Sequence, residues 1–328
     1  MKKQRLLTFA ESINEAQIQA MKLDKNVFIF GLGVEKTGHV FKTTLGIKDK
    51  FSSKRIFESP NSEMALTSMA AGAANNNLRP ILIHHRVDFM AYTFDQLVNW
   101  ISLWSFKSSG KSSMPLVIRA IIGRGWGQGP QHAKTLHSMF SYLPGLTTVM
   151  PSSPSEAKGL MLSSIMSNDP VIFLEYRALF NTKEHVPEEP YFIELGDVRH
   201  RLIGDDITVV AMGPAVLTAI KAQDICKKKI TFDLFDLRVM SNFKLDKILK
   251  SLKKTKKLIC VEDGWGSGST SSELISRIVE LGVELSEPPI KVTWPTSHVP
   301  MSSPLEKDFY FDEMDIVKAA EKLKKINI

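Results

Sequence analysis

Ser59-Pro60-Asn61-Ser62-Glu63-Met64 follows a strand-like stretch at residues 55–57 and opens a helix of small residues that runs through residues 70–74. A strand, a short turn and a helix in this order place the Glu63 carboxylate outside the carboxyl end of a strand, where an open α/β sheet gathers its ligands. A glutamate in the first turn of a helix also stabilises the helix dipole, and the pattern alone does not separate the two roles. The stretch predicts an α/β fold and a candidate functional carboxylate.

The rest of the chain repeats this alternation of strands and helices. Helical patterns at about 9–23, 62–75, 93–107, 154–167, 214–228, 243–253, 268–281 and 313–326 separate apolar runs at 27–30, 81–83, 116–118, 171–174, 207–210, 230–235 and 258–261. Such alternation predicts mostly parallel sheets with helices on both faces. Prolines and charges at 182–190 indicate a domain boundary near 185–200. We expect two doubly wound domains, residues 1–190 and 200–328.

Composition limits the compartment and the partners. The 328 residues contain only two cysteines, Cys226 and Cys260, which favours a reducing cytoplasm. The apolar run near the start is too short for a secretory signal, and no apolar stretch reaches the length of a membrane span. The net charge of +7 comes partly from lysines at helix ends, at 227–229 and 253–257, where cations suit the helix dipole. We therefore expect neither membrane nor nucleic-acid binding.

Two glycine patterns are weak evidence for a nucleotide site. Gly31-Leu32-Gly33 lacks the third glycine of the dinucleotide fingerprint and does not run into a helix, so a Rossmann NAD enzyme is disfavoured. Residues 264–268 follow a strand and open a helix, so this turn could offer amides to an anion or simply allow a close strand-to-helix turn. Signatures of P-loop NTPases, zinc proteases and α/β-hydrolases are absent from the sequence.

Three features follow predicted strands of the first domain and are expected at the same edge of its sheet. They are Glu63, Phe89 and the glycine-rich loop 123–132, which ends in His132. Glycines let the backbone approach a ligand, and an imidazole transfers protons near neutral pH. His137, on a helical stretch, is expected to serve packing or to lie at the surface.

Taken in order, these residues resemble the beta subunits of thiamine-diphosphate-dependent 2-oxoacid dehydrogenases, of the pyruvate and branched-chain types, within the transketolase-like superfamily. The resemblance covers nearly the whole chain and includes Pro60-Asn61-Ser62-Glu63, Gln131-His132 and Leu143-Pro144-Gly145-Leu146, with further matches at 9–16, 88–89, 95–99, 108–110 and 157–160. It implies a transketolase-like pyrimidine-binding domain followed by a transketolase C-terminal domain.

The resemblance also implies roles for three residues. The family's glutamate at the position of Glu63 holds the aminopyrimidine ring of the cofactor and favours the tautomer that deprotonates the thiazolium carbon. Its aromatic residue at the position of Phe89 stacks on that ring, and its histidine at the position of His132 faces the substrate and assists proton or acyl transfer. The resemblance leaves open a structural potassium ion at carbonyl groups near residues 164–169.

The diphosphate half of the cofactor site is missing from this sequence. Asp263-Gly264 is not followed by the asparagine of a magnesium diphosphate motif. The resemblance therefore implies an alpha-type partner that holds magnesium, with thiamine diphosphate shared between unlike chains of an α2β2 assembly, and a lipoyl acyltransferase as a candidate acceptor.

The chain departs from the family pattern near the expected substrate. Family members carry acidic residues after the first strand, where this chain reads Gly31-Leu32-Gly33-Val34, which puts coupling between paired active sites in doubt. His85, Arg86 and Lys134 replace other residue types and, with Arg124, could bind a hydroxylated or phosphorylated substrate, or could form structural ion pairs or contact the partner.

Three hypotheses about function follow. The first is the beta subunit of a two-chain thiamine-diphosphate enzyme that decarboxylates a 2-oxoacid and passes the acyl unit to lipoamide. The second is a split transketolase-like or acyloin-forming enzyme acting on a sugar or another hydroxylated substrate. The third, from a different class, is a non-catalytic scaffold or regulatory partner. The sequence names neither the substrate, the acceptor nor the alpha chain.

Overall fold

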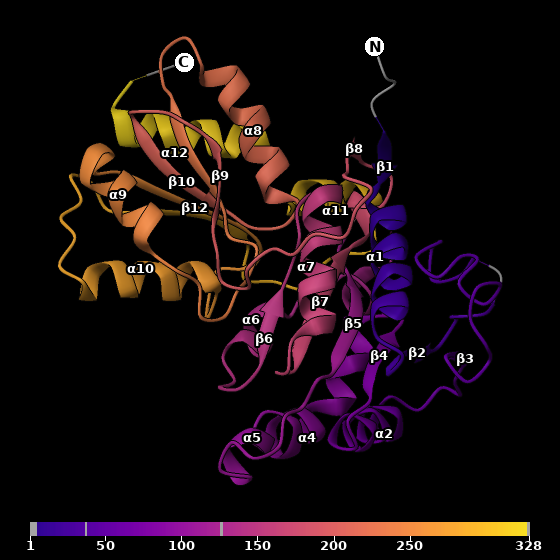
Figure 1. The fold of residues 1–328 in the computed structure, drawn as a ribbon. Coiled ribbons are helices and arrows are strands. Elements are labelled where there is room, and N and C mark those ends of the chain that lie inside the picture. Colours follow the sequence, from indigo (N-terminus) through magenta and orange to yellow (C-terminus); the bar gives the residue numbers. More distant parts are fainter. Residues whose placement is uncertain (1–4, 37, 125–126, 327–328) are drawn as a thin grey trace. The chain divides into compact units, whose positions relative to one another are not determined.

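The computed structural model describes residues 5–36, 38–124 and 127–326 (Figure 1). These residues form two compact units. The first contains the chain up to Gly123 together with Met139–Leu195, and the second contains Arg124–Ser138 together with the chain from Gly196 onward. The segment Arg124–Ser138 thus interrupts the first unit in sequence and belongs to the second by its contacts. Of the predicted glycine-rich loop, Gly125 and Trp126 lie outside the described residues.

The first unit is built on a six-stranded sheet in which every neighbouring pair of strands is parallel. Its strands are, in spatial order, β3 (Ile56–Glu58), β2 (Val27–Gly31), β4 (Arg79–His84), β5 (Val117–Ile122), β7 (Val171–Tyr176) and β6 (Thr147–Val149). Every residue of β5 and β7 is buried, as expected for strands covered on both faces. A separate antiparallel pair joins β1 (Leu6–Thr8) to β8 (Lys183–His185).

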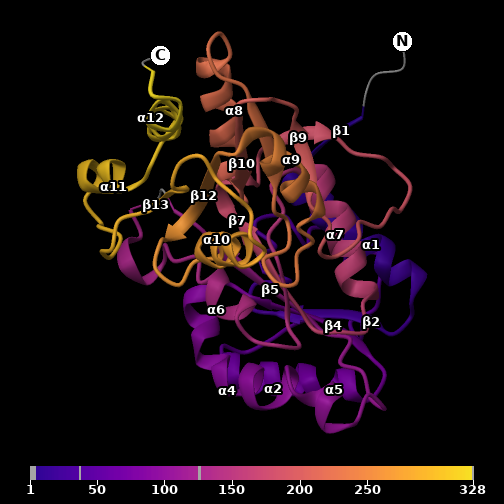
Figure 2. The same cartoon turned by 90° about the vertical axis from the view of Figure 1, so that its left-hand side faces the viewer.

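Helices cover both faces of this sheet. Figure 2 shows α1 (Phe9–Leu23) and α7 (Pro154–Met166) on one side of the strands, and α2 (Glu63–Asn75), α4 (Phe94–Gln96) and α5 (Trp104–Lys107) on the other. The helix α1 begins at a capping box: Glu11 N donates to Thr8 Oγ1 at 3.1 Å, and Thr8 N donates to Glu11 Oε2 at 2.8 Å. The arrangement confirms the predicted doubly wound class for this unit.

The prediction of a single helix over 93–107 is wrong. The structure divides this region into α3 (Val87–Met90), a 3₁₀ turn (Ala91–Thr93), α4, a π turn (Leu97–Ile101) and α5. The π turn arises because Ser102 N donates to the carbonyl of Leu97, five residues back, at 3.0 Å. The spacing of apolar residues does not reveal one extra residue within a turn, so the sequence pattern predicted one continuous helix.

A buried ion pair lies in the core of the first unit. Arg119, in β5, pairs with Glu175 of β7, and both side chains are fully buried. Its guanidinium also donates to Gln17 Oε1 at 2.6 Å and Thr43 Oγ1 at 2.8 Å. The ion pair and these hydrogen bonds offset the free-energy cost of burying the Arg119 charge in an apolar core.

The second unit has a five-stranded sheet, parallel except for one edge strand. In spatial order it contains β13 (Ile290–Trp294), β12 (Leu258–Trp265), β10 (Ile207–Ala211), β11 (Phe232–Asp236) and the antiparallel β9 (Arg199–Leu202). The helices α8 (Ala215–Cys226) and α12 (Glu313–Lys324) contact each other, whereas α9 (Asp246–Thr255) contacts β10 and α10 (Thr270–Glu280) contacts β12. The short helix α6 (His137–Ser141) begins at the helical stretch expected around His137, whereas the short helix α11 (Ser303–Phe309) was not predicted. None of the helices in the described part of the chain has the length and apolar character needed to cross a bilayer.

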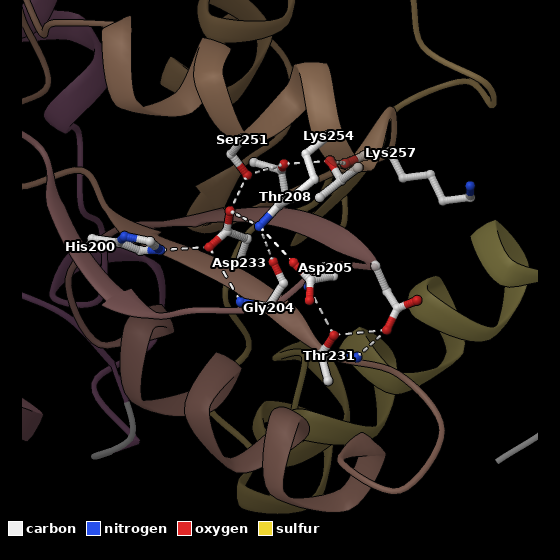
Figure 3. Close-up of polar contacts among 11 residues, drawn as sticks. His200, Gly204, Asp205, Thr208, Thr231, Asp233, Ser251, Lys254 and Lys257 are labelled. Carbon is white, nitrogen blue, oxygen red and sulfur yellow. Dashed lines mark hydrogen bonds and ion pairs between the residues drawn. The ribbon is translucent and has the colours of Figure 1, made fainter.

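A buried aspartate fixes the edge of the second sheet (Figure 3). The carboxylate of Asp233, in β11, lies 2.6 Å from His200 Nε2 of β9 and accepts a 2.6 Å hydrogen bond from Ser251 of α9. Lys254, also in α9, lies 3.2 Å from Asp233 and donates to the carbonyl of Gly204 at 2.6 Å. One carboxylate therefore ties the edge strand, a loop and a helix to β11.

Candidate functional site

The strands β3, β4 and β5 end at one edge of the first sheet, because they run parallel with β2 between β3 and β4. Glu63 is the first residue of α2, which follows β3, and Phe89 lies in α3, which follows β4. The helices α2 and α3 contact each other. The structure thus gathers the carboxylate and the aromatic ring at the edge where the sequence predicted them.

The Glu63 carboxylate is half-buried and has no hydrogen-bond or ion-pair partner among the described residues. Only its backbone carbonyl is bonded, by Thr67 Oγ1 at 2.9 Å. Thr67 Oγ1 also lies 3.0 Å from Nε2 of His84, and burial lowers the pKa of His84 to about 4, so this imidazole is neutral at pH 7. The first turn of α2 is therefore fixed to β4, while the acid at its tip is open to an external group.

The next two residues after His84 are held by the protein itself. The imidazole of His85 stacks on Phe41 with ring centroids 5.6 Å apart, and burial together with the charge of Arg86 lowers its pKa. Arg86 is 7% exposed, lies 3.5 Å from Asp88 and donates to the carbonyl of Gly123 at 3.2 Å. Of the roles left open for Arg86, its contacts support the structural ion pair.

The predicted proton-transfer residue belongs to the second unit. His132 follows a 3₁₀ turn at Gly129–Gln131, its backbone N donates to the carbonyl of Gly129 at 3.3 Å, and its side chain is half-buried. The next residue, Ala133, is buried in the core of the second unit, and Lys134 is half-buried. Glu63 and Phe89 thus belong to one unit, and His132 and Lys134 to the other.

Sequence reasoning missed the carboxylates that hold this loop. His137 is 2% exposed, and its Nε2 lies 2.6 Å from Glu262 Oε1. Arg124 Nε lies 3.1 Å from Asp263 Oδ2, so this arginine also has a structural partner. Glu262 and Asp263 are both buried at the end of β12. Two adjacent acids inside an apolar strand were the signal that could have identified them, because buried carboxylates need partners.

Contacts within the protein account for both glycine patterns. After β2, the amides of Gly33 and Glu35 donate to the carboxylate of Glu58 at 2.7 and 3.0 Å, so an acidic side chain already occupies this turn. In the second pattern, a Cβ on Gly264 would lie 3.1 Å from His137 Cε1. Gly264 therefore serves the close approach of a neighbouring segment.

An arginine, Arg79, donates hydrogen bonds to the turn near residues 164–169, where the resemblance left a potassium ion possible. Arg79 donates to the carbonyls of Ile165 and Ser167 at 3.2 and 2.8 Å, and to Asn168 Oδ1 at 2.7 Å. A guanidinium offers five N–H donors and a positive charge, so it satisfies these oxygens directly. The residues of this turn therefore do not fit a potassium ion. No group of three or more His, Cys, Asp or Glu side chains among the described residues is arranged to hold a metal.

Each of the two units corresponds to a known protein family model. A family model described as the transketolase pyrimidine-binding domain matches residues 6–183, and one described as the transketolase C-terminal domain matches residues 196–316. The chain is 34% identical over 319 residues to the beta subunit of acetoin:2,6-dichlorophenolindophenol oxidoreductase of Bacillus subtilis, covering 93% of each chain. It is 32% identical over 286 residues to the pyruvate dehydrogenase E1 beta subunit of Staphylococcus epidermidis, covering 87% of this chain and 88% of the relative. The chain belongs to the transketolase-like family of these beta subunits.

A solved structure extends the likeness of this transketolase-like chain to its fold. The structure is described as a split-gene transketolase in an inactive beta4 tetramer; it matches with a TM-score of 0.80 over 98% of this chain and 99% of the other. At 17% identity this match concerns the fold alone. The predicted family and the predicted pair of transketolase-like α/β domains are both confirmed.

Proposed function

We propose that this transketolase-like chain is the beta subunit of a two-chain thiamine-diphosphate enzyme that acts on a 2-oxoacid. The names of the Bacillus and Staphylococcus relatives, both beta subunits of oxidoreductases or dehydrogenases, support this reading. The strongest structural support is Glu63, whose half-buried carboxylate lies at the carboxyl edge of the parallel sheet without a partner among the described residues.

The chain's residues fit the pyrimidine half of thiamine diphosphate. When bound, thiamine diphosphate supplies a nucleophilic carbon that adds to the substrate carbonyl and allows the adjacent carbon–carbon bond to break. Glu63 holds a proton against a ring nitrogen of the aminopyrimidine, and the Phe89 ring, 36% exposed, offers a flat apolar face to the same ring. His132 moves a proton to or from the reacting group.

An alpha-type partner supplies the rest of the cofactor site, including magnesium. The surface around α2 suits such a partner, because Met64 and Met69 of α2 are 54% and 59% exposed, and Trp100, which lines a groove together with α2, is 52% exposed. A groove of about 270 Å³ lined by small residues of α2 and by Trp100 separates α2 from the following helices. Because Glu63 begins the same helix, a chain bound here lies next to the proposed cofactor carboxylate.

We propose an assembly of two alpha and two beta chains in a reducing cytoplasm, with a lipoyl acyltransferase as acceptor. Both cysteines in the described part of the chain are free and buried, and burial raises the pKa of the Cys226 thiol to about 11, which suits a reducing compartment.

A second candidate substrate is an acyloin, because the Bacillus relative is named for acetoin. To test both, the chain is purified with its alpha-type partner, and 2,6-dichlorophenolindophenol reduction is measured with pyruvate, a branched-chain 2-oxoacid, acetoin and a sugar donor. Thiamine-dependent turnover of a 2-oxoacid, followed by acyl transfer to lipoamide, supports the proposal. Turnover of acetoin alone supports the second candidate, and turnover of sugar donors alone refutes both.

A further inference from the structure

The segment that contains His132 is attached to the second unit at both of its ends. It runs from Arg124 to Ser138, and its described residues contact Glu262 and Asp263, two adjacent residues of β12. The two carboxylates hold two separate parts of this segment, Asp263 near Arg124 and Glu262 near His137. In the sequence, His132 lies between these two attachment points, Arg124 and His137.

The beginning of the segment is attached through Asp263. Arg124 Nε lies 3.1 Å from Asp263 Oδ2, while Trp294 Nε1 donates to Asp263 Oδ1 at 2.5 Å. The Arg124 guanidinium also lies over the ring of Tyr310, 4.4 Å from its centroid. Asp263 is 1% exposed, so its carboxylate is desolvated and the ion pair is little screened by solvent.

The end of the segment is attached through Glu262. His137 Nε2 lies 2.6 Å from Glu262 Oε1, and Ser138 Oγ donates to the same oxygen at 3.3 Å. Glu262 also accepts from the amides of Thr270 and Ser271, at 3.2 and 2.7 Å, in the first turn of α10. Burial opposes the charge, but the hydrogen bonds from His137 and Ser271 outweigh it and lower the pKa of Glu262.

Two further contacts support the same segment. Ala133, adjacent to His132, is 1% exposed and packs in the core of the second unit. Gly264, the residue after Asp263, allows Thr135 and His137 to approach β12, since a Cβ there would lie 3.3 Å from Thr135 Oγ1 and 3.1 Å from His137 Cε1. The backbone on the C-terminal side of His132 is thus packed directly against β12.

We propose that Glu262 and Asp263 are positioning residues that fix the His132 loop for catalysis, an inference that rests on the proton-transfer role proposed for His132. The two acids are not proposed to touch the cofactor. They act through the loop, because a misplacement of about 1 Å in a reacting group can reduce a rate about 100-fold. The second unit therefore sets the position of a residue that the first half of the sequence encodes.

The test uses the complete two-chain enzyme with thiamine diphosphate and magnesium. The variants are Glu262→Gln and Asp263→Asn, and the matched control is Glu273→Gln, an exposed acid on α10. We expect both variants to lower kcat about 10-fold or more with little change in KM, and to shift the pH profile of kcat. Hydrogen–deuterium exchange of peptides covering residues 127–132 should rise in both variants and stay unchanged in the control.

Exchange of the loop peptides at the control rate in both variants overturns the proposal, and so does faster exchange with unchanged kcat and pH profile. A lower thermal midpoint with normal kcat per assembled enzyme indicates a structural role only, which also overturns it. If the unmodified enzyme shows no thiamine-dependent turnover, the proposed function fails, while the exchange data still decide whether these carboxylates hold the loop.

Discussion

Replacing Asp233 with asparagine should destabilise the second unit by about 3 kcal/mol at pH 7. The Asp233 side chain is 4% exposed and is bonded to His200 and Ser251 at 2.6 Å and to Lys254 at 3.2 Å. Removing one charged member of a buried network costs about 3–5 kcal/mol. We take the lower end of this range because asparagine has nearly the volume of aspartate. In addition, Lys254 is 42% exposed, so solvent screens its attraction to Asp233.

The loss should also depend on pH. Burial opposes ionisation of Asp233, but hydrogen bonds from Ser251 and His200 outweigh it and hold its pKa below the usual value of 3.8. A carboxylate with a lowered pKa stabilises the fold above its unfolded-state pKa, and this stabilisation is lost as the pH falls through the folded-state pKa. The difference between wild type and Asp233→Asn should therefore shrink below about pH 4.

The assay is urea unfolding of the full chain at pH 7 and in acid, with hydrogen exchange of peptides from β9 and β11 to localise the change. Asp224→Asn is the control, because Asp224 forms an ion pair with Lys227 in which both side chains are more than half exposed. The control should leave the urea midpoint unchanged. A loss for Asp233→Asn no larger than the control's, or one that persists in acid, would show that the Asp233 carboxylate does not stabilise this edge of the sheet.

Three further predictions concern the first unit. The folded-state pKa of His84 is about 4, so the stability that neutral His84 contributes is present above its unfolded-state pKa of about 6.5 and should be lost as the pH falls toward 4. Thermal unfolding of His84→Gln should lack this part of the pH dependence. An unchanged pH profile of the thermal midpoint in His84→Gln would contradict this prediction. Because Arg79 engages the turn oxygens, potassium and sodium buffers should give the same thermal midpoint for the assembled enzyme, and a higher midpoint in potassium alone would contradict this. Arg119→Met should destabilise the fold by about 3–5 kcal/mol in urea unfolding by leaving Glu175 buried without its charge partner, and Arg119→Met/Glu175→Gln should recover part of the loss; no recovery would count against the ion pair.

Regular elements were predictable where local signals agreed with the fold. The helix α1 occupies residues 9–23 as predicted, because a capping box and an apolar stripe define it locally. The buried parallel strands were predictable from apolar runs, although Arg119 in β5 was not, since its partners come from distant segments. Long-range pairing of a buried charge leaves no periodic signal in the sequence.

The candidate site was predictable only in part for a similar reason. Glu63 and Phe89 lie at the expected edge because parallel strands place their carboxyl ends together. The grouping of the His132 segment with the second unit depends on contacts with Glu262 and Asp263, more than a hundred residues later in the chain. No pattern around His132 itself indicates that attachment.

The role proposed for Glu63 is to hold the cofactor's aminopyrimidine. Its most direct test is thiamine-dependent 2-oxoacid turnover by the chain paired with its alpha-type partner, compared with the Glu63→Gln pair. We predict that turnover falls by about 10²-fold or more while the two chains still elute as one assembly, because the isosteric amide cannot hold the proton in the same way. Unchanged turnover by the Glu63→Gln assembly would show that Glu63 does not hold the cofactor.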